Sequence, residues 1–451
     1  MKNWITLALL MPLLVVAAPQ QIDHGRFENV RVWAPAQAAQ QVVLYLGAAK
    51  GWQPADDQNA NALQAAGALV IGIDGAQMRR AFDADGADCV YPAGDLENLS
   101  RFVQAYTRQP DTRLPVLVSH SDGALVYAAL AQVPAGHFAG GVSEDFSPLI
   151  KQWQKPLCAG EALRQSTAVS GSQRLQAAPT LANPMVVLAD QARREPLAVA
   201  PFAKNIPALR VASLRGLQPG TLAGLKAAVA SLSAQARPLA GAAPPDLKNL
   251  PVIEDRAPGD NPTLAIFWSG DGGWATIDKE VSENLQQQGI SVVGVDSLRY
   301  FWSARTPQDV ARDTAAIARH YLAAWGKKKL LLIGFSQGAD VLPFALSRLD
   351  PALRRQVSLF AALSLSRRAA FEFHLSSWVD DRDQGLPTAP EIARLGDIPT
   401  WCIYGAEDAD SVCAELAPSA KLTVKQLPGD HHFNGDHAAL TTLILAALQK
   451  P

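Results

Sequence analysis

The sequence predicts an α/β fold that is built twice in tandem. Apolar β-branched runs alternate with helical patterns along the 451 residues, and the same order of motifs occurs in both halves. The chain also exceeds the roughly 250 to 300 residues at which a single hydrophobic core stops growing. We therefore expect two domains, each with a parallel sheet that is covered by helices on both faces.

The internal duplication is supported by a constant spacing between matching segments. Strand-like segments with glycine-rich ends reach Trp52 in the first half and Trp274 in the second, 222 positions later. The next strand-like segments end at Asp74 and Asp296, which are also 222 positions apart. Further on, LPVLVSHSDGALVYAAL and KLLLIGFSQGADVLPFAL each read as a buried strand, a tight turn around a serine, and a helix.

An alanine- and proline-rich stretch separates the two copies. Residues 236–252 have no clear periodicity and are predicted to form a linker. We place a first α/β domain at residues 24–235 and a second one at residues 253–451.

The first 18 residues are typical of a secretory signal peptide. Lys2 is followed by an apolar run and then by the small residues Ala17 and Ala18. The apolar run is shorter than the roughly 20 residues of a spanning helix, so cleavage is favoured over an uncleaved anchor. Export is therefore expected, and a net charge of -2 gives no electrostatic basis for nucleic-acid binding.

Four cysteines are present, and an even number in an exported chain permits disulfides. Cys402 lies in a predicted strand and Cys413 lies just beyond the following loop, so these two are candidates for a local bridge. Two unpaired buried thiols are the alternative, and the pairing of Cys89 and Cys158 stays open. None of the four has metal-ligand spacing, and we expect neither a metal nor a cofactor.

The second copy contains a candidate nucleophile. Ser336 is the centre of a G-x-S-x-G sequence that lies directly between a strand and a helix. Gly334 and Gly338 suit a turn that is too tight for side chains, and such a turn exposes the serine at the edge of the sheet. This context predicts an α/β-hydrolase fold with Ser336 as its nucleophile.

A serine nucleophile needs a base, which should follow it in the chain. His374 comes too early, whereas the segment LPGDHHFNGDH follows the last predicted strand. We prefer His431 as the base because it directly follows a glycine-containing turn, and His432 is the alternative.

The acid that orients the base is expected after the strand PTWCIYG. Glu407, Asp408 and Asp410 follow that strand, and at least two of these carboxylates should only be solvated. We prefer Asp408, and Asp410 is the alternative.

Two backbone N–H groups are expected to stabilise the oxyanion. One belongs to Gln337, which follows the nucleophile. The other is assigned to Asp271 or Gly272 in the glycine-rich loop 269–274, for which a purely structural turn is the alternative.

Aromatic residues near strand ends are interpreted as a pocket or lid for an apolar substrate, with plain core as the alternative. The predicted substrate-binding residues are Trp274, Tyr300, Trp302, Phe371 and His374.

The first copy lacks this chemistry. Ser121 matches the nucleophile, but Ser119 replaces the first glycine of the turn. The stretch Leu209 to Gly220, where the second copy has its histidines, contains none. We therefore predict that the first domain is degenerate and non-catalytic.

The segments FWSGDGGW, SLRYFWSARTPQD, IGFSQGADVLPF and CIYGAEDADSVC, followed by LPGDHHFNGD, resemble the bacterial VirJ/AcvB family of virulence proteins. The resemblance covers the C-terminal half, and the preceding degenerate half makes the chain similar to the longer AcvB type. It implies a periplasmic hydrolase that cleaves the aminoacyl ester of lysyl- or alanyl-phosphatidylglycerol at the outer leaflet of the inner membrane. The family's site residues fall on Ser336, on His431 and His432, and on Asp408 and Asp410.

Two other functions stay open. A general esterase or thioesterase would use the same Ser, His and Asp groups with a different pocket. An accessory protein of a secretion or virulence system would use both domains as docking surfaces for a protein partner.

Overall fold

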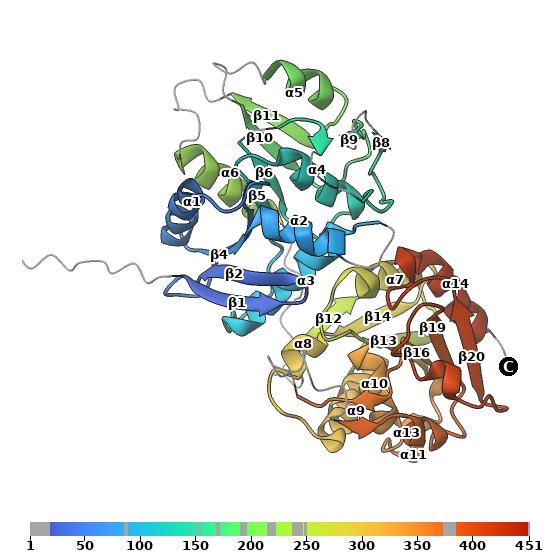
Figure 1. Cartoon of the computed structure of the whole chain (residues 1–451). Coiled ribbons are helices and arrows are strands. Elements are labelled where there is room, and N and C mark those ends of the chain that lie inside the picture. Colours follow the sequence, from blue (N-terminus) through green and yellow to red (C-terminus); the bar gives the residue numbers. More distant parts are fainter. Residues whose placement is uncertain are drawn as a thin grey trace, which may run out of the picture.

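The computed structural model describes residues 19–84, 89–144, 146–150, 153, 155–167, 172–189, 196–213, 222–236, 247, 250–372 and 385–449. The predicted signal peptide, most of the predicted linker and His374 lie outside these residues. Figure 1 shows two α/β units, the first in blue to green and the second in yellow to red. Within the described residues, no helix is both long and apolar enough to cross a membrane.

The first half forms one eight-stranded sheet with the order β1-β2-β4-β3-β5-β6-β10-β11. Its strands are β1 (Gln20–His24), β2 (Phe27–Trp33), β3 (Gln41–Leu46), β4 (Ala68–Ile73), β5 (Val116–Ser119), β6 (Gly140–Ser143), β10 (Met185–Ala189) and β11 (Leu209–Ser213). Its helices are α1 (Pro54–Ala65), α2 (Gly75–Ala84), α3 (Pro92–Tyr106), α4 (Gly123–Gln132), α5 (Pro196–Ala203) and α6 (Leu222–Gln235). A small separate sheet contains β7 (Leu149–Ile150), β8 (Gln165–Thr167) and β9 (Gln173–Leu175).

The second half forms a seven-stranded sheet with the order β12-β14-β13-β15-β16-β19-β20. Its strands are β12 (Val252–Asp255), β13 (Thr263–Trp268), β14 (Ser291–Val295), β15 (Lys329–Phe335), β16 (Val357–Leu363), β19 (Thr400–Gly405) and β20 (Leu422–Leu427). Its helices are α7 (Thr276–Gln287), α8 (Ser297–Tyr300), α9 (Pro307–Ala324), α10 (Gln337–Leu346), α11 (Pro351–Arg354), α13 (Ala389–Ala393) and α14 (His437–Leu448), and the short strands β17 (Arg368–Ala369) and β18 (Leu386–Pro387) pair with each other.

The strand orders confirm the predicted tandem α/β fold. Without β1, the order of the first sheet repeats strand by strand in the second. In both sheets the first strand of this order is antiparallel to its neighbour, and every later pair is parallel. The chain therefore contains the same topology twice.

Both faces of the second sheet are buried, as its apolar strands require. Along β13, Leu264, Ile266 and Trp268 belong to one apolar cluster, and the intervening Ala265 and Phe267 belong to another. Successive side chains of a strand point to opposite faces, so helices cover both sides of this sheet. The loops after β13, β15, β16, β19 and β20 are therefore left to form a site at the carboxyl edge of the parallel strands.

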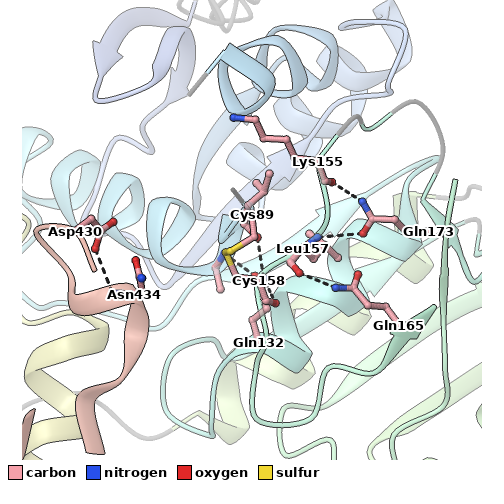
Figure 2. The surroundings of a disulfide bond; sticks show 11 residues. Cys89, Gln132, Lys155, Leu157, Cys158, Gln165, Gln173, Asp430 and Asn434 are labelled. Carbon is pink, nitrogen blue, oxygen red and sulfur yellow. Dashed lines mark hydrogen bonds between the residues drawn. A yellow bond between two sulfur atoms is a disulfide. The ribbon is translucent and has the colours of Figure 1, made fainter. Parts of the chain in front are cut away.

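Two disulfides are present. The predicted bridge between Cys402 and Cys413 is confirmed, and it ties β19 to the segment after the acidic loop. The sequence left Cys89 and Cys158 open, and they form a second bridge within the first half. Figure 2 shows this second bridge, with Asp430 and Asn434 of the second half in its surroundings.

Candidate active site

Ser336 lies in a strained turn between β15 and α10. Its backbone has φ 50° and ψ -120°, a left-handed region that a non-glycine residue adopts only when the surrounding structure enforces it. A Cβ on Gly338 would lie 2.1 Å from the Trp268 carbonyl oxygen, and a Cβ on Gly334 would lie 2.5 Å from the Ala339 nitrogen. Both glycines are therefore required by close backbone contacts, as the G-x-S-x-G pattern predicts.

His431 and Asp408 form a hydrogen-bonded pair at the same edge of the sheet. His431 Nδ1 donates to Asp408 Oδ2 over 3.1 Å, and the Asp408 side chain is only 3% exposed. Asp408 follows β19, and a Cβ on Gly405 would lie 2.1 Å from the Asp430 carbonyl oxygen. The end of β19 therefore packs directly against the loop that carries His431.

Neighbouring strands bring this pair to the serine. The Ser336 N–H donates to the Leu363 carbonyl over 2.9 Å, and the next residue, Ser364, donates from its hydroxyl to the His431 carbonyl over 2.9 Å. The Phe335 ring lies 5.4 Å from the His431 ring, measured between centroids. Ser336, His431 and Asp408 thus belong to one cluster, although they come from three separate loops.

Of the two alternatives, Asp410 and His432, neither takes part in this pair. Asp410 is exposed, and its backbone carbonyl accepts a hydrogen bond from Arg367. The backbone N–H of His432 donates to Asp430.

The ionisation of the pair suits a base and its orienting acid. Burial disfavours the charged form of His431, but the hydrogen bond and charge of Asp408 outweigh burial, so the pKa of His431 is raised. Burial also opposes ionisation of Asp408, but the hydrogen bond and charge of His431 leave its pKa lowered. At neutral pH Asp408 is therefore anionic beside an imidazole whose pKa is raised above its ordinary value.

Asp340 is a site residue that the sequence analysis did not identify. It lies one helical turn after Ser336 in α10, and its carboxylate accepts a 2.7 Å hydrogen bond from the Ser366 N–H. Burial raises the pKa of Asp340 to about 8, although that hydrogen bond and the charge of His431 act in the opposite direction. The sequence signal that could have identified Asp340 is a carboxylate within the largely apolar helix QGADVLPFAL.

The predicted oxyanion loop lies against the nucleophile. Gln337 is the first residue of α10, so its N–H has no intrahelical acceptor. Gly270, which the sequence analysis did not single out, lies against the serine: a Cβ there would lie 3.5 Å from the Ser336 Cβ. Asp271 and Gly272 follow it in the same loop, before α7 begins.

The assignment of Trp274 and Tyr300 as substrate-binding residues is wrong. Trp274 is 2% exposed and packs edge to face on Phe267, with ring centroids 5.4 Å apart. Tyr300 is 1% exposed, and its hydroxyl donates to Asp313 over 2.6 Å. Both side chains therefore belong to the apolar core of the second half, which is the alternative that the sequence left open.

The other aromatic predictions have mixed outcomes. Trp302 lies edge to face with Phe102 of the first half, so it belongs to the contact between the two halves. Phe371 is half-buried and contacts Phe344 in α10, which places it near the elbow helix. His374 lies outside the described residues.

The corresponding turn in the first half has a relaxed backbone. Ser121 is not among the described residues with positive φ. The Ser119 hydroxyl, which stands where the second copy has a glycine, accepts a 2.9 Å hydrogen bond from the Asp122 N–H. Asp122 is in turn paired with the buried Arg79. Asp122 stands where the second copy has Gln337, so this ion pair lies at the turn itself. The absence of catalysis in the first domain stays a prediction.

The chain was compared with curated proteins and with solved structures. No match was found among curated proteins. Solved structures similar to the chain include an α/β serine hydrolase without a lid from Xanthomonas campestris (18% identity, TM-score 0.30, 44% of this chain and 87% of that one). They also include Est1E from Butyrivibrio proteoclasticus (16%, 0.33, 44% and 94%) and an α/β serine hydrolase homologue from Coxiella burnetii (15%, 0.31, 43% and 89%).

The family comparison matches the half that carries Ser336, His431 and Asp408. Residues 262–451 match the model of the bacterial virulence protein VirJ. This match agrees with the resemblance carried by the sequence motifs, and it begins at β13, the first parallel strand of the second sheet. The second half of the chain, residues 262–451, therefore belongs to the VirJ family of bacterial virulence proteins.

Proposed function

We propose that this protein is a serine hydrolase of carboxylic esters, with Ser336 as the nucleophile, His431 as the base and Asp408 as the group that orients the base. The observation that carries the proposal is the strained Ser336 backbone next to the hydrogen-bonded His431 and Asp408. Strain of this kind persists only where the fold enforces it, and a base with a buried acid partner is what a serine hydroxyl needs to react at neutral pH.

The reaction has two steps. In the first, Ser336 Oγ bonds to the ester carbonyl carbon while His431 takes the hydroxyl proton; the ester C–O bond then breaks, and His431 gives that proton to the leaving alcohol. In the second, His431 takes a proton from water as the water oxygen attacks the acyl-enzyme carbon. The Ser336–acyl bond breaks, the proton returns to Ser336, and the free acid is released.

The negative charge of the intermediate needs backbone donors. The N–H of Gln337 and the N–H groups of the loop at Gly270, Asp271 and Gly272 are the candidates, because this loop lies against Ser336. Each donor of this kind is worth about 10²- to 10³-fold in kcat.

For the substrate, we propose the aminoacyl ester of alanyl- or lysyl-phosphatidylglycerol, cleaved on the periplasmic side of the inner membrane by an AcvB-like two-domain form. Membership of the second half in the VirJ family and the signal-like first 18 residues support this proposal. An aminoacyl ester also carries an ammonium group next to the scissile carbonyl. The carboxylate of Asp271 contributes to raising the pKa of His431, so it lies within electrostatic reach of the base and suits a cationic acyl group.

The test is the release of free amino acid from vesicles that contain alanyl- or lysyl-phosphatidylglycerol, with p-nitrophenyl acetate as a second substrate. Wild-type protein is expected to release amino acid, and Ser336→Ala to release none. Asp271→Asn is expected to raise KM for the aminoacyl lipid and to leave KM for p-nitrophenyl acetate unchanged. Cleavage of p-nitrophenyl acetate alone would favour a general esterase. No cleavage of either substrate would favour an accessory protein of a secretion system.

A further inference from the structure

The first domain contacts the oxyanion loop of the second. Helix α3 lies where the two halves meet (Figure 1), and its Asn98 side chain lies against Gly272. A Cβ on Gly272 would lie 2.8 Å from Asn98 Nδ2, 3.0 Å from Cγ and 3.1 Å from Oδ1, and these are the three atoms nearest to it. The amide of Asn98 therefore limits where the backbone at position 272 can lie.

Asn98 is itself held in place within the first domain. His24 Nε2, at the end of β1, donates to Asn98 Oδ1 over 3.0 Å. The His24 ring stacks on Phe102, one turn further along α3, with centroids 3.9 Å apart. Burial lowers the pKa of His24, so this imidazole stays neutral and keeps its donor role at neutral pH. With Oδ1 engaged by His24, the amide plane of Asn98 is fixed and its Nδ2 group faces the loop.

The residue before Asn98 anchors the far end of the same loop. Glu97 is buried and accepts hydrogen bonds from Thr276 Oγ1 over 3.2 Å and from Lys279 Nζ, both in the first turn of α7. Lys279 also donates to the Gly136 carbonyl of the first domain over 2.8 Å. Burial opposes the charge on Glu97, but Lys279 and His137 outweigh it and hold the pKa of Glu97 well below its usual range. Glu97 and Asn98 thus fix the oxyanion loop at its exit and at its middle.

The loop that carries the base also faces the first domain. Asp430 and Asn434, on either side of His431 and His432, lie in the surroundings of the Cys89–Cys158 disulfide (Figure 2). Two loops of the site, the oxyanion loop and the loop that carries His431, therefore have neighbours in the first domain.

We propose that Asn98 is a positioning residue for catalysis at Ser336, and that the degenerate first domain is retained because it holds the oxyanion loop in its working geometry. This proposal rests on the serine-hydrolase function proposed above. Asn98 acts through the backbone at Gly272, which carries a candidate oxyanion donor, and a misplacement of such a donor by about 1 Å costs up to about 10²-fold in rate.

The test is a double-mutant cycle on the full-length protein, with kcat for p-nitrophenyl acetate measured per active site titrated with a fluorophosphonate. Gly272→Ala places a methyl against the Asn98 amide, whereas Gly272→Ala with Asn98→Ala removes the three atoms that this methyl would meet. We expect each single variant to lower kcat about tenfold with KM changed less than about threefold. We expect the double variant to lose about tenfold as well, rather than about 100-fold, because the two changes act on one contact.

Thr112→Ala is the matched control, because it removes another hydrogen bond between the domains, the 2.8 Å contact from Arg299, which is made by α8 and not by a residue of the oxyanion loop. Its kcat should stay within about twofold of wild type, because the loss of this part-buried hydrogen bond leaves Asn98 and Gly272 unchanged. Multiplicative losses in the double variant, an unchanged kcat in Asn98→Ala, or an equal loss in Thr112→Ala would each overturn the proposal. Wild-type protein that cleaves p-nitrophenyl acetate but no aminoacyl lipid would refute only the lipid substrate, and wild-type protein that cleaves neither would refute the hydrolase and this inference together.

Discussion

Replacing Asp408 by asparagine should disable the base without removing it. The hydrogen bond of 3.1 Å to His431 Nδ1 is made by a carboxylate that is 3% exposed, so its charge is poorly screened by water. An amide at this position keeps the shape but loses the charge, and it can present N–H to the imidazole and favour the wrong tautomer. Losses of about 10²- to 10⁴-fold in kcat/KM, or about 3 to 5 kcal/mol of transition-state stabilisation, are expected for such a change.

The same substitution should shift the pH profile in a defined direction. Catalysis needs neutral His431, and the charge and hydrogen bond of Asp408 raise the pKa of His431 above its usual 6.5. The acid limb of kcat/KM in wild-type protein should therefore lie above pH 6.5. Without the Asp408 carboxylate, burial of His431 is opposed only by the smaller effects of Asp271 and Asp340, so the limb should move to lower pH.

The assay is hydrolysis of p-nitrophenyl acetate between pH 5 and 9, with Asp410→Asn as the matched control. Asp410 was the alternative acid in the sequence, and its side chain is exposed. The control should keep kcat/KM within about threefold of wild type, as is usual for a surface substitution. Equal losses in both variants, or an acid limb that stays in place in Asp408→Asn, would refute the assignment of Asp408 as the orienting acid.

Three further outcomes follow from the structure. Gly338→Ala should abolish the titratable active site and lower the thermal unfolding midpoint, because its Cβ would lie 2.1 Å from the Trp268 carbonyl oxygen; retained titration in a protein of unchanged midpoint would contradict this reading. Asp340→Asn should flatten the pH dependence of the free energy of unfolding. The folded protein holds the Asp340 proton up to about pH 8, whereas an exposed carboxyl loses it near pH 3.8, so the stability of wild-type protein should fall as pH rises between these values. An equal fall in wild-type protein and in Asp340→Asn would contradict the burial of this carboxyl group. Lys279→Ala should cost about 3 to 5 kcal/mol in urea unfolding, because Glu97 loses a buried charge partner; a cost below about 1 kcal/mol, the usual value for an exposed ion pair, would contradict a buried network.

The fold and the principal site residues were predictable because their signals are local. The G-x-S-x-G pattern encodes contacts between the turn and adjacent backbone, and the structure places Ser336 at φ 50° in that turn. The spacing shared by the two halves likewise encodes one topology used twice, and the two strand orders repeat it. The preference for His431 came from the glycine-containing turn directly before it, and the preference for Asp408 came from its place three residues after Gly405 at the end of a strand.

The remaining features depend on tertiary contacts that sequence spacing does not report. Trp274 and Tyr300 follow strand ends, as pocket residues often do, but their packing in the apolar clusters of the second half leaves them 2% and 1% exposed. The raised pKa of Asp340 arises from burial, which a single polar residue in an apolar helix does not reveal. The contact between Asn98 and Gly272 joins two domains. Gly272 belongs to the glycine-rich segment FWSGDGGW, but Asn98 belongs to no motif that the sequence analysis found.

The most direct measurement of the central claim is the intact mass of the protein after treatment with a fluorophosphonate, followed by peptide mapping. Activated Ser336 should give one adduct per chain on the peptide that contains residues 334–338, and Ser336→Ala should give none. Ser121 should stay unlabelled in both proteins. Absence of an adduct in wild-type protein, or an adduct that persists in Ser336→Ala, would contradict the assignment of Ser336 as the nucleophile.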